Sequence, residues 1–290
     1  MGENFKTLDA ASYDDAAAAF NQLSETYSRP FADALVEFAE IPAVAARVLD
    51  LGCGPGILGR AVKRSQARSW LASSDLSRPM LQQARASGTS ELVQADAELL
   101  GFQANSVDAV VSLFLMRHLP DPLRSLQACR EILSPDGTLA IGLGGGPLRA
   151  SWDGVADAAR RLGALIASAT LARLEAPAML ISLMNEIDVP QVDRDDVDGN
   201  SLTARQIVAL VSEAGFSQVR SRWVGRDFVI DSVEEFWELQ TTFSTHVRKR
   251  LSLCDAAVRM RLKDEFFKRC DRLSVELRYP CGVLMIRAKH

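Results

Sequence analysis

The chain has 290 residues, of which 48% are hydrophobic and 24% charged, and its formal net charge is −4. A chain of this length can bury a large core without disulfides or metals, and the small negative charge gives no electrostatic reason to expect nucleic-acid or membrane-surface binding. No run approaches the roughly 18 apolar residues of a membrane span, and we expect no secretory signal, because no basic segment precedes an apolar run at the start. The five cysteines are scattered and form no C-x-x-C pair, which predicts reduced thiols in the cytoplasm and no metal site.

Helices and short strands are expected to alternate through the first half of the chain. Two helices are predicted within 14–40, and helical segments at 77–85 and 121–133. Apolar runs predict strands at 48–51, 70–75, 91–96, 107–113 and 138–143. This pattern indicates an α/β fold with a parallel sheet covered on both faces. Ligands bind such sheets beside the carboxyl ends of the strands.

Helical insertions interrupt this alternation after residue 147. Residues 148–186 are rich in Ala and Leu, 187–200 are acidic and loop-like, and 232–275 form a second insertion, while helix 203–215 and strand 216–225 resume the core. We therefore expect one domain of residues 1–290, made of N-terminal helices 14–40, a core of 45–147, 201–231 and 276–290, and a helical cap of 148–200 and 232–275.

A glycine-rich segment follows the first strand. In VLDLGCGPG, residues 48–56, an apolar strand ends at Leu51 and Gly52, Gly54 and Gly56 alternate with other residues. Such glycines let the backbone turn sharply and leave room for a ligand. The same region also satisfies G-x-G-x-x-G from Gly54 onward, the dinucleotide fingerprint. A tight turn without a ligand is a third interpretation.

Asp75 and Asp96 are placed where two further strands end. Asp75 lies about 20 residues beyond Gly56, a spacing that suits an acid accepting hydrogen bonds from both ribose hydroxyls. Alternatively it caps the next helix, although Ser77 can also do so. At Asp96 a carboxylate can accept from the exocyclic amine of an adenine while a neighbouring backbone N–H donates to the ring. A nicotinamide-dinucleotide enzyme does not need an acid at this position, so Asp96 argues against that interpretation.

These segments together resemble the class I S-adenosylmethionine (SAM)-dependent methyltransferase family, most of all its ubiquinone/menaquinone-biosynthesis and biotin-synthesis branches. The resemblance covers residues 13–143 in order and spacing and is carried by VLDLGCGPG, SDLSRPMLQQAR, ADAELLGF, VDAVVSLFLMRHLPD and EILSPDGTL. It implies a Rossmann-like core with a mostly parallel seven-stranded sheet, and SAM as the cofactor. The cofactor-binding residues that it implies are Gly52, Gly54 and Gly56 at the methionine part, Asp75 at the ribose, Asp96 and Ala97 at the adenine, Leu76 and Met80 beside the ring, and Leu113 after the fourth strand.

Two aromatic residues and one histidine complete the predicted site. Phe20 and Tyr27 have the Phe–Tyr spacing of the biotin branch, whose first helices close over SAM; ordinary amphipathic packing explains them equally well. His118, past the fourth strand, is the candidate catalytic base, since imidazole titrates near working pH. Alternatively it only stabilises the following turn. Arg117 beside it is a candidate for an anionic substrate group or for a salt bridge.

The resemblance implies methyl transfer to a small molecule, with a natural product or a carboxylate as candidate acceptors. The alternative is a SAM-binding enzyme that catalyses a decarboxylation or cyclisation. Basic residues at 246–250 and 268–269 either contact an acidic partner, such as a carrier protein or a carboxylate substrate, or form a solvated helix face. We expect a monomer or homodimer, with no nucleic-acid or membrane partner.

Overall fold

The computed structural model describes residues 2–14, 16–42, 46–145, 176–192, 200, 202–273 and 277–290. The described chain divides into two compact units. One comprises Met1–Gly144, Arg194–Val224 and Val283–His290, and the other comprises Gly145–Asp193 and Gly225–Gly282. Most of the predicted helix 148–186, and residues 193–199 of the predicted loop 187–200, lie outside the described residues.

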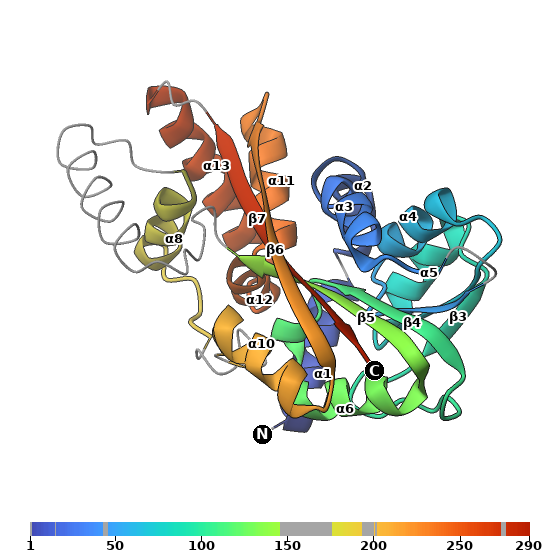
Figure 1. Ribbon diagram of the computed structural model, residues 1–290. Coiled ribbons are helices and arrows are strands. Elements are labelled where there is room, and N and C mark those ends of the chain that lie inside the picture. The colour runs from blue at the N-terminus through green and yellow to red at the C-terminus, as the bar shows by residue number, and fades with distance from the viewer. Residues whose placement is uncertain are drawn as a thin grey trace. The chain divides into compact units, whose positions relative to one another are not determined.

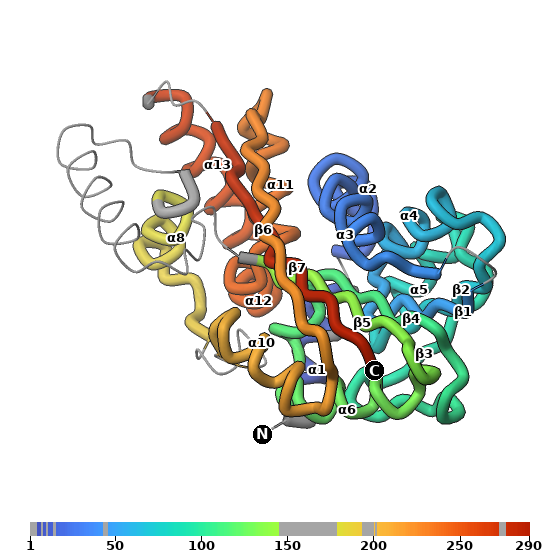
Figure 2. Tube along the Cα trace, viewed as in Figure 1, coloured from blue at the N-terminus to red at the C-terminus, as the bar shows by residue number. Residues whose placement is uncertain are grey.

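A seven-stranded sheet has the order β3-β2-β1-β4-β5-β7-β6, and Figure 2 shows β1 and β2 beside β4. The parallel pairs are β1 with β2 and β4, β2 with β3, and β4 with β5. Strand β7 runs antiparallel to β5, because His290 N–H donates to the Gly137 carbonyl while Val283 lies beside Gly142. The mostly parallel seven-stranded sheet is therefore confirmed. The strands are β1 Arg47–Leu51, β2 Trp70–Asp75, β3 Glu91–Gln94, β4 Val107–Leu113, β5 Leu133–Gly145, β6 Ser217–Val229 and β7 Arg278–Lys289.

Helices cover both faces of the sheet in the first unit. Helices α3 and α4 pack on each other, and α6 packs on α10; Figure 1 shows these two pairs on opposite sides of the sheet. The central strands are therefore buried on both faces, which explains why β4 is apolar almost throughout. The helices of this unit are α1 Gly2–Asp14, α2 Ala17–Tyr27, α3 Arg29–Ala39, α4 Ile57–Ser65, α5 Arg78–Ala86, α6 Pro122–Ile132 and α10 Ala204–Glu213.

The second unit has an aromatic core. Phe266 stacks on Phe236 with ring centroids 6.2 Å apart, and Trp237 lies 5.6 Å from Phe266. The helices described in this unit are α8 Ala176–Glu186, α11 Val233–Phe243, α12 Thr245–Ser252 and α13 Ala256–Leu273.

Several predictions about individual elements were wrong. An additional helix, α1, precedes the two predicted within 14–40; its apolar periodicity is too weak to be recognised. Strand β3 ends at Gln94, so Asp96 lies in the turn beyond it. The basic segment of α12 is not a solvated face, because the residues from Arg248 to Arg250 are buried. Arg250 instead donates to the carbonyls of Val189 and Pro190.

Candidate functional site

The turn after β1 has three glycines with left-handed backbone conformations. Gly52, Gly54 and Gly56 have φ of 67°, 52° and 85°, a region that L side chains rarely adopt. A Cβ atom on Gly52 would come within 2.8 Å of Leu115, and one on Gly56 within 2.9 Å of the Thr89 hydroxyl. A Cβ on Gly54 would have no neighbour within 4 Å. Gly54 therefore faces open space at the carboxyl edge of the sheet.

Asp75, at the end of β2, is bound to this turn. Its Oδ2 accepts from the Gly54 N–H and its Oδ1 from the Ser77 N–H, both at 2.8 Å. Ser77, rather than Asp75, caps α5, because the Ser77 hydroxyl accepts from the Met80 N–H. Burial raises the pKa of the Asp75 carboxyl, and the two N–H groups partly offset this. A carboxylate offers about four lone-pair sites, so Asp75 retains acceptor capacity for a ligand.

Asp96 lies in an ionic cluster with α1. Lys6 Nζ donates to Asp96 Oδ2 at 2.7 Å and to Glu98 Oε2 at 2.6 Å, while Asp96 Oδ1 accepts from the Glu98 N–H. Burial acts to raise the pKa of Asp96, but the hydrogen bonds from Lys6 and from the Glu98 N–H outweigh it, and the pKa lies below its ordinary value. Glu98 Oε1 also accepts from the Asp121 N–H at 2.8 Å. Glu98 thus joins the turn after β3 to the start of α6.

The predicted apolar contacts of the cofactor differ in exposure. Leu76 is 40% exposed beside Asp75, whereas the others are buried. The buried residues are Tyr27 on α2, Met80 on α5, Ala97 after β3 and Leu113 at the end of β4. Only Leu76 is thus open to a ligand without movement of its neighbours.

His118 ends a short 3-10 turn, Met116–His118, after β4. Asn200 fixes this turn by donating to the Met116 and Leu119 carbonyls, both at 2.8 Å. Arg117 Nε donates to the Gly144 carbonyl at 3.1 Å. The backbone around His118 is therefore held from two other segments of the same unit.

Asp9 on α1 approaches the same histidine. Its Oδ2 lies 3.2 Å from His118 Nδ1, although the two groups are not aligned as a hydrogen bond. The Tyr13 ring meets the His118 ring edge-on, with centroids 6.1 Å apart. Helix α1 therefore contacts both the turn after β3 and the turn after β4.

Four polar residues of this site were missed by the sequence analysis, namely Lys6, Asp9, Glu98 and Asn200. Glu98 had a local signal, since it follows Asp96 in the same motif. The other three join segments that are far apart in the chain: 90 residues separate Lys6 from Asp96 and 84 separate Asn200 from Met116. No spacing rule in a single sequence predicts such pairs.

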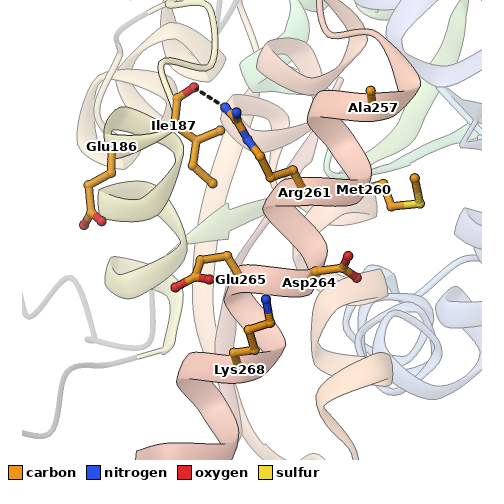
Figure 3. Close-up of a pocket in the computed structure, with 8 residues that line it drawn as sticks. All are labelled: Glu186, Ile187, Ala257, Met260, Arg261, Asp264, Glu265 and Lys268. Carbon is orange, nitrogen blue, oxygen red and sulfur yellow. Dashed lines mark hydrogen bonds between the residues drawn. The ribbon is translucent and has the colours of Figure 1, made fainter.

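A separate hollow of about 510 Å³ lies in the second unit, between the end of α8 and α13. In Figure 3, Arg261 reaches from α13 to the Ile187 carbonyl, with which it forms a hydrogen bond of 3.2 Å. The other residues that line the hollow are Glu186, Ala257, Met260, Asp264, Glu265 and Lys268. Acidic and basic groups alternate there, and none of the predicted site residues lines it, so the hollow indicates no ligand class.

No helix in the described ranges has both the length and the apolar character needed to cross a membrane. The same ranges contain no group of three or more His, Cys, Asp or Glu side chains that could hold a metal ion.

Comparison with known proteins relates this site to one enzyme family. Residues 49–141 match the family described as "Methyltransferase domain". Ubiquinone biosynthesis O-methyltransferase of Xanthomonas campestris is 36% identical over 109 residues, which are 36% of this chain and 45% of that protein. The Xylella fastidiosa protein of the same name is 34% identical over 107 residues, 35% of this chain and 43% of that protein. The chain thus matches less than half the length of these relatives.

Solved structures share the fold at low sequence identity. Phosphoethanolamine N-methyltransferase 2 of Haemonchus contortus has a TM-score of 0.55 in its complex with phosphomonomethylethanolamine and S-adenosylhomocysteine, and 0.53 in its complex with S-adenosyl-L-methionine. The first of these is 14% identical and covers 98% of this chain and 59% of its own. The YcgJ protein of Bacillus subtilis has a TM-score of 0.52 at 15% identity, covering 89% of this chain and 97% of its own. The domain match over residues 49–141 confirms the resemblance of this part of the chain to the class I SAM-dependent methyltransferases. The solved structures confirm the Rossmann-like fold.

Proposed function

We propose that this protein transfers a methyl group from SAM to a hydroxyl group of a small molecule. The observation that carries the proposal is the arrangement of Gly54 and Asp75: the glycine faces open space, and its N–H fixes the carboxylate beside it. The family match over residues 49–141 supports the cofactor. The description of the relatives as O-methyltransferases supports the hydroxyl acceptor.

The residues present fit the parts of SAM. Gly54 leaves room for the methionine part, and Asp75 retains acceptor sites for the ribose hydroxyls. Asp96 offers a carboxylate to the adenine amine, next to the backbone of Ala97, and Leu76 offers an exposed apolar surface. The other predicted residues are constrained by packing, and we assign them to the wall of the site. They are Gly52, Gly56, Met80, Leu113 and Tyr27.

The sulfonium of SAM supplies a methyl group that is already activated. The protein has to align the acceptor, exclude water and remove the hydroxyl proton. His118 is the proposed base, because Asn200 fixes its turn at the carboxyl edge of the sheet. Residues 148–200 and 232–275 are proposed as the helical cap that selects the acceptor. A natural product that bears the hydroxyl group is the acceptor class consistent with this step. A carboxylate acceptor, the other class expected from the sequence, would take the methyl group without losing a proton.

Cofactor binding is tested by Asp75→Ala. Loss of hydrogen bonds to a charged group costs about 1.5–3 kcal/mol, so the Kd for SAM should rise roughly tenfold to a hundredfold. Calorimetry with SAM, S-adenosylhomocysteine and NAD measures this and tests the dinucleotide alternative. Asp33→Ala is the matched control, because Asp33 is an exposed acid on α3 whose ion pair with Arg64 lies outside the site.

The outcome separates the interpretations of Asp75. SAM binding weakened in Asp75→Ala but not in Asp33→Ala supports the ribose assignment. Equal affinity in both variants and the wild type contradicts it, and binding of NAD in place of SAM contradicts the function as a whole. The carrier-protein partner, the monomeric or dimeric state and the cytoplasmic location stay predictions.

A further inference from the structure

Helix α1 presents a buried carboxylate to the proposed base. Asp9 is 8% exposed, and its Oδ2 lies 3.2 Å from His118 Nδ1. Tyr13, one turn further along α1, packs its ring edge-on against the same imidazole. Two residues of one helix therefore define where the His118 ring lies, although the helix is about 100 residues away in sequence.

The position of α1 is itself fixed by charge. Lys6, three residues before Asp9, donates to Asp96 and Glu98 at 2.7 and 2.6 Å. Glu98 is buried and also accepts from the Asp121 N–H, just after the His118 turn. This chain of contacts leaves α1 little freedom to slide along the sheet edge, so the approach of Asp9 to His118 is a built feature of the unit.

We propose that Asp9 is a positioning residue for His118. Its carboxylate, 3.2 Å from Nδ1 although not aligned there as a hydrogen bond, favours the tautomer that carries hydrogen on Nδ1, so that Nε2 is left as the proton acceptor. This inference rests on the proposed function and assigns a role to a residue outside the methyltransferase domain match, which begins at residue 49. Orientation of a catalytic histidine by a buried acid is a general device of acid–base catalysis.

The proton balance of the step is simple. The hydroxyl O–H bond of the acceptor breaks as an N–H bond forms at Nε2, which gives an imidazolium that Asp9 stabilises electrostatically. The proton later leaves Nε2 for solvent and the neutral ring is restored. Among the described residues, Tyr13 on α1 meets the ring edge-on, and Asp75 at the end of β2 interacts with it electrostatically. Arg117, in the same turn, donates to the Gly144 carbonyl.

Nitrogen NMR of the histidine rings tests the proposal without any turnover. The chain has only three histidines, so a His118→Ala spectrum assigns the His118 signals. At pH 8, where imidazoles are mostly neutral, the wild type should show hydrogen on Nδ1 of His118. Asp9→Ala should make this tautomer the minor one, Asp9→Glu should restore it at least in part, and Asp33→Ala should leave it unchanged.

Each outcome decides the question. A dominant Nδ1–H tautomer that is lost only in Asp9→Ala supports the positioning role. A dominant Nε2–H tautomer in the wild type overturns it, and this result stands even where Asp9→Ala does not fold. An unchanged tautomer in a folded Asp9→Ala also overturns it and leaves Asp9 as an anchor of α1. Titration of the same samples with S-adenosylhomocysteine tests cofactor binding separately, so failure of the proposed function is distinguishable.

Discussion

Asp50 in β1 is a buried acid, and burial disfavours its charged form. The residue is fully buried within the sheet, where it pairs in register with Ser73 of β2. Neither of its oxygens receives an aligned hydrogen bond from the described residues. Burial raises the pKa of Asp50 to about 7, and the nearby Gly59 amide offsets this only in part. The group is thus predicted to hold a proton in the folded state over a pH range where the unfolded chain has lost it.

Asp50→Asn should remove a pH dependence of stability. The folded-state pKa is above the unfolded value of about 3.9, so stability is full below pH 4 and falls by up to about 1.4 kcal/mol per unit as pH rises toward 7. Between pH 5 and pH 8 the wild type should therefore lose stability that Asp50→Asn retains. Urea unfolding at the two pH values measures the difference.

Asp108→Asn is the control for this experiment. Hydrogen bonding with Arg47 lowers the pKa of Asp108 to about 2, so its contribution is present above pH 4 and is lost only in stronger acid. The Asp108 variant should lose stability equally at pH 5 and pH 8. If Asp50→Asn behaves in the same way, with no change in slope, the buried carboxyl is not protonated near neutrality.

Sequence alone predicted the residues that lie in one continuous motif. Gly52, Gly54 and Gly56 were placed because their spacing after an apolar strand reflects a local backbone requirement, and all three have positive φ. Asp75 was placed because it ends a strand. Lys6 and Asp9 were not, since their partners lie on other segments and nothing near them in the sequence indicates an ion pair.

At the scale of elements, the strands were predicted better than the first helix. Apolar runs such as 107–113 give a strong signal because the central strands of a covered sheet are buried on both faces. Helix α1 gives a weak signal, since its contacts are partly ionic: Lys6 and Asp9 contact other segments, and Phe5 is buried. Hydrophobic periodicity therefore cannot predict it.

The docking of α1 should depend on Lys6. Lys6→Met removes the two ion pairs and leaves Glu98 buried without its cation, which is costly in a partly dry site. Burial acts to lower the pKa of Lys6, but its two carboxylate partners outweigh this and hold the pKa above its ordinary value, so the pair is intact at neutral pH. We expect amide hydrogen exchange in residues 2–14 to become about tenfold faster or more.

Lys63→Met is the matched control, because Lys63 lies on α4 and donates to the Ser69 carbonyl. Exchange in residues 2–14 should be unchanged in that variant. Slow exchange of α1 in Lys6→Met, equal to the wild type, would mean that apolar packing around Phe5 holds the helix without the ion pairs.

At the scale of the whole molecule, two of the divisions between the units fall within strands. Strand β6 contributes residues 217–224 to the first unit and 225–229 to the second, and β7 is divided in the same way between residues 282 and 283. Sequence patterns predicted that the core is interrupted by helical insertions, because the alternation of strands and helices stops. They could not predict that two strands continue into the second unit, since strand length depends on neighbours across the sheet.

Continuous strands should couple the unfolding of the two units. Phe266 is fully buried and stacks on Phe236 in the second unit, and Phe266→Ala should cost roughly 3–5 kcal/mol. If β6 and β7 transmit this loss of stability, calorimetry will show a single unfolding transition that moves to lower temperature. S-adenosylhomocysteine will raise the temperature of that same transition, because it binds the folded state. Phe267→Ala, at a less buried neighbouring ring, should lower it less. A variant in which one transition moves while another stays at the wild-type temperature, still responding to S-adenosylhomocysteine, would show that the first unit folds without the second.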